Sequence, residues 1–312
     1  MQRFKFVLYR PLQTIPVLFG VSLITFVLIR LIPGDPVRVL LGPRAKASII
    51  AAVREQYGLD EPIALQYVYF LYNLAKGEMG RSIIYRIPVL DVILDRLPPT
   101  LFLLSYALLL TIVLALALAI AGARNEGRLP DHLVRMFCTF GIGLPAFWLG
   151  IILIMVFSVG LGWFPVSGYG ETFLEHLHHL FLPALTIAIA LAPVLTRNLR
   201  ATLVEESKAD YVQAARAKGM SGRKIFFRHV LPNSLVPSVN LLGIAFSWLI
   251  GGTVVVETVF SIPGMGQLMV ASIFSRDYLL VQGVTLFFAF GIILTNFLVD
   301  IANAVLDPRI NP

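Results

Sequence analysis

Ionisable side chains are scarce in this chain, so those within apolar segments are the first candidates for chemistry. Asn296, Asp300 and Asn303 have the spacing i, i+4, i+7 and form one polar stripe on an expected helix. Such groups are costly in a membrane and usually face a bundle interior or water. Because the stripe lies off-centre in its apolar segment, we expect a helix–helix hydrogen-bond network or a gate contact rather than a direct solute ligand.

Glu257 ends a different apolar segment, at its expected outer end. A carboxylate there could meet the amino group of an incoming solute, or it could simply be hydrated. Of the two, we favour hydration.

A further group of candidate ligands lies in "ETFLEHLHHL", where Glu175, His178 and His179 share one helical face. Carboxylates and imidazoles bind metal ions, but the H-E-x-x-H spacing of zinc proteases is absent. Because clustered surface histidines are commoner than ligand sets, we expect no metal site here.

Sequence patterns for enzymatic chemistry are missing. The chain has no G-x-x-x-x-G-K-[ST] loop for ATP and no glycine-rich dinucleotide motif. Its apolar segments hold no His–Glu metal pair and no convincing Ser–Lys dyad. We therefore expect no catalytic residues and no cofactor bound by this chain.

The elements that must position these residues are membrane helices. Of the 312 residues, 57% are hydrophobic and 14% are charged, against roughly 25% charged in soluble domains. Because backbone polar groups must pair within lipid and no stretch alternates with period two, helices are favoured over a barrel. We predict an all-α integral membrane fold with six transmembrane helices, in the uncharged stretches 11–29, 100–123, 136–170, 176–196, 229–256 and 278–299.

The distribution of Lys and Arg predicts the orientation of these helices. Three basic residues precede the first helix, three separate the second from the third, and eight separate the fourth from the fifth. The loop between the third and fourth helices has none, so both termini are expected in the cytoplasm. Contact with anionic lipid headgroups accounts for the formal net charge of +7 without a nucleic-acid partner.

The segment 31–99 carries mixed charge, and long loops cross the membrane largely regardless of charge. We expect a small folded extracytoplasmic element there, with a helix over 63–75 that places Tyr67, Phe70 and Leu71 on one face. The predicted parts are a cytoplasmic N-terminus and first helix over 1–30, the outer segment 31–99, a core over 100–306 and a cytoplasmic tail over 307–312.

The basic loop 197–232 lies between the fourth and fifth expected helices and has its own local order. Gly219 stands where a left-handed helix C-terminal residue would, Ser221 can cap a second helix, and Pro232 is expected to end it. The sequence thus predicts a helix, a tight turn and a second helix. We expect the first helix to present one exposed face made of Tyr211, Ala214, Ala215 and Lys218.

The segment "QAARAKGMSGRKIFFRHVLP" resembles the EAA loop of binding-protein-dependent ABC importer permeases. Ala214, Ala215, Gly219 and the Leu231–Pro232 pair have the spacing of that loop, while Gln213 replaces its usual glutamate. Further similarity to the peptide and nickel branch of the family lies in "LIPGDP", "YGLDEPIALQYVYFLYNLAKGEMGRS", "RLPPTLFL", "VVVETVFSIPGMGQLMVASIFSRDY" and "LDPRI".

The resemblance implies a type I ABC importer fold and a B-type permease subunit in the bacterial cytoplasmic membrane. It implies a second permease subunit of the C type, two cytoplasmic ATPases that bind ATP and Mg²⁺, and an extracytoplasmic solute-binding protein. It also implies that the loop carries a coupling helix that rests on an ATPase. The residues assigned to this coupling are Asp210, Tyr211, Gln213, Ala214, Ala215, Arg216, Gly219, Leu231 and Pro232.

The function expected from these features is import of dipeptides, oligopeptides or similar solutes by alternating access. Import of nickel or glutathione on the same scaffold is the alternative within the family. A membrane assembly protein without transport activity is the alternative outside it, although such a protein needs no EAA-like spacing. The candidate path or gate residues are Glu257, Asn296, Asp300 and Asn303.

Overall fold

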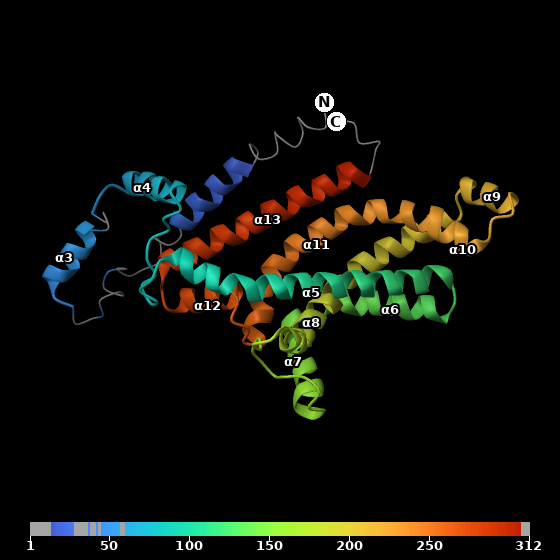
Figure 1. Cartoon of the computed structure of the whole chain (residues 1–312), viewed down its shortest axis with the longest axis horizontal. Helices are drawn as coiled ribbons and strands as arrows, with labels where there is room; N and C mark the ends of the chain where they lie inside the picture. The colour runs from blue at the N-terminus through green and yellow to red at the C-terminus, as the bar shows by residue number, and fades with distance from the viewer. Residues whose placement is uncertain (1–13, 28–36, 38–41, 43–44, 57–59, 307–312) are drawn as a thin grey trace. The chain divides into compact units, whose positions relative to one another are not determined.

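The computed structural model describes residues 14–27, 37, 42, 45–56 and 60–306 of the chain. The "LIPGDP" motif, the predicted cytoplasmic tail and most of the predicted N-terminal part lie outside the described residues. The described chain is helical and forms two compact units (Figure 1). Of the described residues, unit 1 contains 101–262 and 292–306, and unit 2 contains those before 101 together with 263–291.

Four described helical stretches are long and apolar enough to cross a membrane. A fifth candidate is a bent helix pair, and the helix Thr14–Val27 is shorter. The prediction of six spans therefore stays a prediction, while four or five apolar spans are found in the described chain. The four are α5 (Val89–Arg124), α8 (Phe173–Ser207), Leu241–Val259 of α11 (Leu231–Val259) and Tyr278–Val299 of α13 (Tyr278–Leu306).

The third expected span, over 136–170, is not one straight helix. α6 (Leu129–Gly143) ends before Pro145, and α7 (Ala146–Leu153) with the π-helix η1 (Ile154–Gly160) continues at an angle of 109° (Figure 1). Leu144 is extended at ψ 123° because the following proline disfavours the helical region. An uncharged stretch alone could not show this break.

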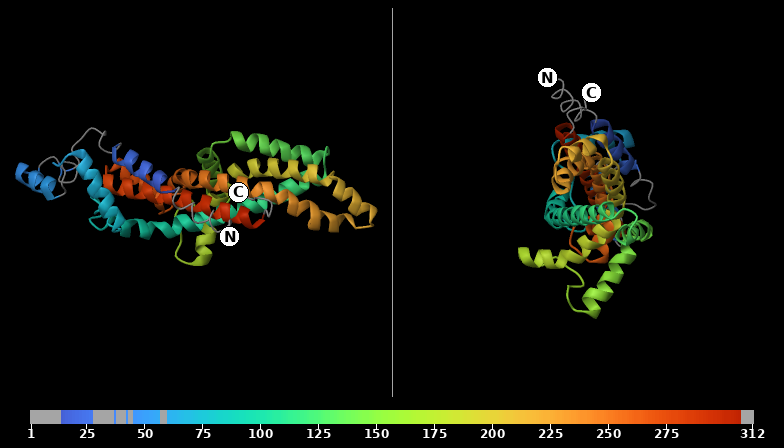
Figure 2. Two further views of the ribbon diagram at one scale, coloured as in Figure 1. Left: turned by 90° about the horizontal axis from the view of Figure 1, so that it is seen from above. Right: turned by 90° about the vertical axis from the view of Figure 1, so that its right-hand side faces the viewer.

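Unit 1 is organised around α8, which packs against α6, α7 and α11. Threonine and glutamate at its start form a reciprocal capping box, Thr172 with Glu175. α6 lies alongside α8 (Figure 2). Their close approach depends on Gly141, where an added Cβ would come 2.5 Å from the ring of Pro193.

The loop after α8 contains α9 (Asp210–Ala217), α10 (Gly222–Ile225) and the π-helix η2 (Phe226–Val230). The predicted helix, turn and helix are present. However, Pro232 does not end the second helix, because η2 runs directly into α11 and Pro232 occupies its first turn. A proline in the first turn of a helix removes an N–H that has few partners there in any case, so the chain stays helical.

Unit 2 contains the helix Thr14–Val27, α3 (Ala47–Gln56), α4 (Ile63–Ala75), the first turns of α5, α12 (Met265–Phe274) and the first half of α13. The bounds of α4 confirm the helix predicted over 63–75. Its Tyr67 packs against Phe19 and Phe26 at ring-centroid distances of 5.7 and 5.0 Å. The Ser22 and Tyr67 hydroxyls lie 2.8 Å apart, so an aromatic cluster joins the first helix to α4.

A buried aspartate organises the other side of unit 2. Asp277 is fully buried and caps α13, because its Oδ1 accepts a bond from the Leu280 N–H at 3.3 Å. Its Oδ2 accepts bonds from the Ser82 hydroxyl at 2.5 Å and the Ile84 N–H at 3.2 Å. The start of α13 is thus tied to the turn that precedes α5.

The contact of Gly141 with Pro193 gives a first prediction. Gly141→Ala forces α6 away from a rigid proline ring and should lower the free energy of unfolding by about 1–3 kcal/mol. Gly143→Ala is the matched control, because a Cβ there meets nothing within 4 Å. Thermal unfolding in detergent should separate the two variants, and equal midpoints would contradict the close approach.

Candidate functional site

The short helix α9 has one face buried in its own chain and one face exposed. Val212 is fully buried and Ala215 is 9% exposed. Tyr211, Ala214 and Lys218 are exposed. The expected shared face is therefore wrong for Ala215, because the chain folds back and packs the Ala215 side of the helix against α8. The other exposed side chains of α9 are those of Asp210, Gln213, Arg216 and Ala217.

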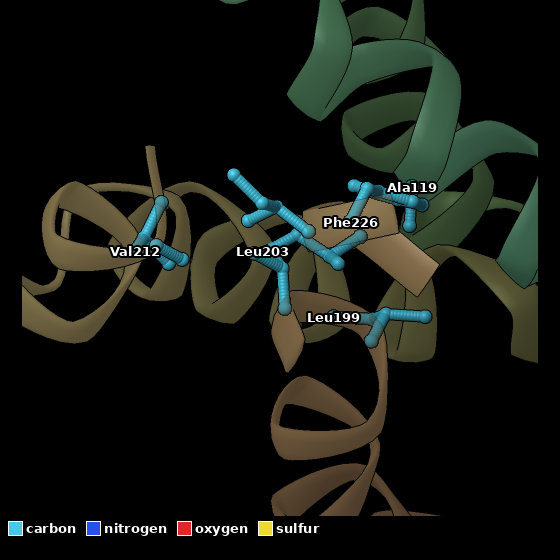
Figure 3. Packing of buried hydrophobic residues seen from close by; sticks show 8 residues of the cluster. Ala119, Leu199, Leu203, Val212 and Phe226 are labelled. Carbon is cyan, nitrogen blue, oxygen red and sulfur yellow. The ribbon is translucent and has the colours of Figure 1, made fainter. Parts of the chain in front are cut away.

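The buried face of α9 belongs to a compact apolar cluster at this end of unit 1 (Figure 3). Val212 and Ala215 from α9 meet Leu203 from α8 and Phe226 from η2 in this cluster. Ala119 extends it to α5. The remaining buried members are Leu199, Ile225 and Val230, with Met220 and Leu231 among the half-buried residues packed against them.

α9 ends in a Schellman motif, in which Gly219 has the left-handed conformation that the sequence predicted. Gly219 has φ +77°, its N–H donates to the Arg216 carbonyl at 2.9 Å, and the Met220 N–H donates to the Ala215 carbonyl at 3.2 Å. Ser221 occupies the N-cap position of α10, although its side chain makes no capping bond. The turn between α9 and α10 is thus held by backbone bonds and by Met220 packed on the cluster.

Tyr211 connects α9 to the elements on either side of it. Its hydroxyl donates to the Glu206 carboxylate of α8 and accepts a bond from the Asn233 amide of α11 at 3.2 Å. Partial burial, and secondarily the bond to Glu206, raise the pKa of Tyr211 above its ordinary value. The phenol therefore stays neutral at physiological pH and acts as a hydrogen-bond donor. The Tyr211 bonds thus fix the start of α9, and the turn at Gly219 fixes its end.

Asp131 of α6 forms a charged network that sequence analysis did not identify. This aspartate is 0% exposed, and its two oxygens accept bonds from the guanidinium of Arg200 of α8 at 2.5 and 2.8 Å. Its Oδ2 also accepts bonds from Arg135 at 2.5 Å and from the Gly127 N–H at 3.0 Å. In the sequence, Arg135 and Arg200 served only as topology signals, and the i, i+4 spacing of Asp131 and Arg135 was the one available hint.

The candidate gate residues of the sequence occupy different environments. Glu257 is fully buried, so the expectation that it is hydrated is wrong, because α11 places it inside unit 1 two residues before the helix ends. Asn296 accepts a bond from the Ser247 hydroxyl at 3.2 Å, which joins α13 to α11. Asp300 and Asn303 belong to the last turns of α13, and their side chains lie outside the described residues.

The histidines after the third expected span hold a loop. His176, His178 and His179 contact the carbonyls of Tyr169, Trp163 and Ser167 at 2.9, 2.8 and 3.0 Å. Within the described part of the chain, no group of three or more histidine, cysteine, aspartate or glutamate residues could hold a metal ion. Each of these three imidazoles thus contacts a backbone carbonyl of the loop that precedes α8.

The positive φ of Gly219 gives a second prediction. Gly219→Ala or Gly219→Val should destabilise the turn by roughly 1–2 kcal/mol, because a side chain is strained in the left-handed region. Gly222→Ala is the control, since Gly222 lies in α10 without a positive φ and has open space around it. Hydrogen exchange of amides 210–225 should rise only in the Gly219 variants, and equal protection would contradict the turn geometry.

Comparisons with known proteins agree on one family. The family model "Binding-protein-dependent transport system inner membrane component" matches residues 111–312, and its N-terminal companion matches residues 3–104. The chain is 40% identical over 306 residues to the glutathione transport system permease protein GsiC of Escherichia coli (strain K12), covering 98% of both chains. The corresponding protein of Salmonella typhimurium is 39% identical over 306 residues, again with 98% of both chains covered.

A solved structure supports the fold. An inward-facing conformation of the MetNI methionine ABC transporter aligns with a TM-score of 0.53 at 18% sequence identity, covering 69% of this chain and 96% of that chain. This likeness concerns the fold alone. The chain therefore belongs to the binding-protein-dependent transport system inner membrane component family, and it is a multi-pass inner-membrane permease subunit of an ABC importer.

Proposed function

We propose that α9 is the coupling helix of this permease and that its exposed face rests on a cytoplasmic ATPase. The observation that carries the proposal is the division of α9 into a face packed on its own chain and a face left open. The open face contains Tyr211, Ala214 and Arg216, and Tyr and Arg are enriched at the centres of interfaces. The small Ala214 lets a partner surface approach the helix backbone.

Ala215, Gly219, Leu231 and Pro232 serve the same interface indirectly. Ala215 and Leu231 pack on the apolar cluster, and Gly219 closes the turn that fixes α9. Pro232 lies in the first turn of α11, so it belongs to the membrane helix that continues from the loop. Asp210 begins α9, where a carboxylate suits the positive end of the helix dipole. These residues shape the coupling helix, while the open face makes the contact.

The full transporter on this proposal contains this chain, a second permease subunit of the C type, two ATPases and an extracytoplasmic solute-binding protein. ATP and Mg²⁺ bind to the ATPases, whose closure biases the permease pair between inward-open and outward-open states. The basic residues in the 197–232 loop favour a cytoplasmic position for α9, both termini on that side and the 31–99 segment outside. Glu257, Asn296, Asp300 and Asn303 remain the proposed path or gate residues.

The solute is proposed to be a small peptide-like molecule, with glutathione as the specific candidate. The support is 40% identity over 98% of both chains to permeases named for glutathione transport. Glutathione is itself a tripeptide, so the same path suits other short peptides. Nickel import on the same scaffold is the second candidate from the sequence.

Reconstitution with the cognate solute-binding protein should decide the solute. We expect ATP-dependent accumulation of labelled glutathione or dipeptides in proteoliposomes and no accumulation of Ni²⁺. Vesicles with the permeases but without ATPases serve as the control. Uptake of Ni²⁺ without uptake of any peptide would contradict the proposed solute class.

The two neighbouring alanines of α9 provide a test of the coupling helix. Ala214→Asp places a charge on the open face and should abolish solute-stimulated ATP hydrolysis while leaving unit 1 folded. Ala215→Asp buries an unpaired carboxylate in the apolar cluster, so it should instead expose the loop to proteolysis, at a cost of at least about 2 kcal/mol.

Ala52→Asp is the matched control for these variants, because Ala52 is an exposed alanine of α3 in unit 2. It should leave both ATP hydrolysis and proteolysis unchanged. Normal coupling in the Ala214→Asp transporter would refute the docking of α9 on the ATPase.

A further inference from the structure

We propose that Asp131 is a positioning residue for transport: it locks the ends of α6 and α8 together so that a displacement of α9 moves both helices as one rigid body. The proposal rests on the proposed role of α9 as the coupling helix. The role proposed here belongs to Asp131 and its two arginines, which lie outside the face of α9 that docks on the ATPase.

The Asp131 network contains more bonds than charge neutralisation needs. Oδ1 of Asp131 accepts a bond from Nε of Arg200 at 2.5 Å, and Oδ2 accepts one from Nη2 of the same guanidinium at 2.8 Å. Such a two-point bond fixes the orientation of the two groups as well as their distance. Asp131 is 0% exposed and the Arg200 side chain is 17% exposed, so water competes little for the pair.

The place of the network in unit 1 suits the transmission of movement. Arg200 lies within the last turns of α8, and the loop to α9 begins after Ser207. The first residue of that loop, Lys208, forms a salt bridge with Glu126 at 2.9 Å. Glu126 precedes Gly127, whose N–H donates to Asp131. The chain that enters α9 is therefore bonded to the same turn that Asp131 holds.

A third helix lies beside the network. At Gly122 of α5, an added Cβ would lie 3.4 Å from Oδ1 of Asp131 and 3.5 Å from the Arg200 side chain. These are ordinary van der Waals distances, so this part of α5 lies directly beside the pair. α5, α6 and α8 thus meet at one charged contact close to the base of α9.

A directional hydrogen-bonded ion pair transmits movement between two helices better than an apolar contact does. Buried ion pairs add little net stability compared with well-packed apolar residues, so stability alone is a weak reason for this network. Apolar side chains can slide between packings, whereas a bidentate pair has one geometry. The pair therefore transmits displacement from α8 to α6 and on to the bend at Pro145.

The first experiment measures solute transported per ATP hydrolysed by the complete transporter in proteoliposomes. Asp131→Asn should lower this ratio roughly tenfold while the ATPases still copurify with the permease. Arg200→Lys keeps the charge and loses the two-point bond, so it should also lower the ratio; a merely charge-neutralising role predicts no change. Asp95→Asn is the matched control, because it makes the same change at an exposed aspartate of α5 whose ion pair with the neighbouring Arg96 lies outside the network, and it should act within about twofold.

The second experiment tests rigidity directly with spin labels. In a Cys138→Ala background, nitroxides at exposed positions 140 of α6 and 217 of α9 report the distance between the two helices. The wild-type distance distribution should be the same with and without bound ATP, and it should broaden or shift in Asp131→Asn. A wild-type distance that changes on ATP binding overturns the proposal even if the variants fail to fold.

The outcomes separate this proposal from the one on which it rests. If Ala214→Asp uncouples the transporter while Asp131→Asn and Arg200→Lys do not, the positioning role is overturned and the coupling helix stands. If Ala214→Asp leaves coupling intact, the docking of α9 falls and the role of Asp131 falls with it. Loss of coupling in all three, with a constant wild-type distance, supports both.

Discussion

The packing of α9 on the apolar cluster beneath it is the contact on which the loop after α8 depends. α9 has only eight residues, and isolated helices of that length are unstable in water. Its order comes from Val212 and Ala215, which join the apolar cluster, and from the backbone bonds around Gly219. Because the buried face fixes the helix, the open face keeps a defined direction without a partner present.

Local signals in the sequence were sufficient for several elements. The helix over 63–75 and the left-handed Gly219 follow from helical periodicity and from glycine's freedom at positive φ, and both are present. Periodicity places Ala214 and Ala215 near one another but cannot say which one the rest of the chain covers. Alanine suits a buried contact and an exposed one equally, so the burial of Ala215 depended on the tertiary structure.

Long-range polar contacts were beyond sequence reasoning for a different reason. Asp131 and Arg200 are 69 positions apart, and nothing in the local pattern of either residue names the other. Asp277 and Ser82 are 195 positions apart and present the same difficulty. Basic residues at membrane helix ends indicate orientation, and this interpretation left unnoticed that two of them, Arg135 and Arg200, share a buried partner. In both units, a fully buried aspartate joins segments that are remote in sequence.

The π-helical residues of η2 change the angular phase of the helix that they connect. An α-helix turns by about 100° per residue, so one additional residue in a turn rotates every later side chain by that angle. A helical wheel drawn continuously from α10 to α11 would therefore assign faces wrongly on one side of η2. The loss of a single residue within 226–230 would keep the apolar composition and still turn the whole of α11 about its axis. The five residues of η2 thus set which side of a membrane helix of 29 residues faces its neighbours.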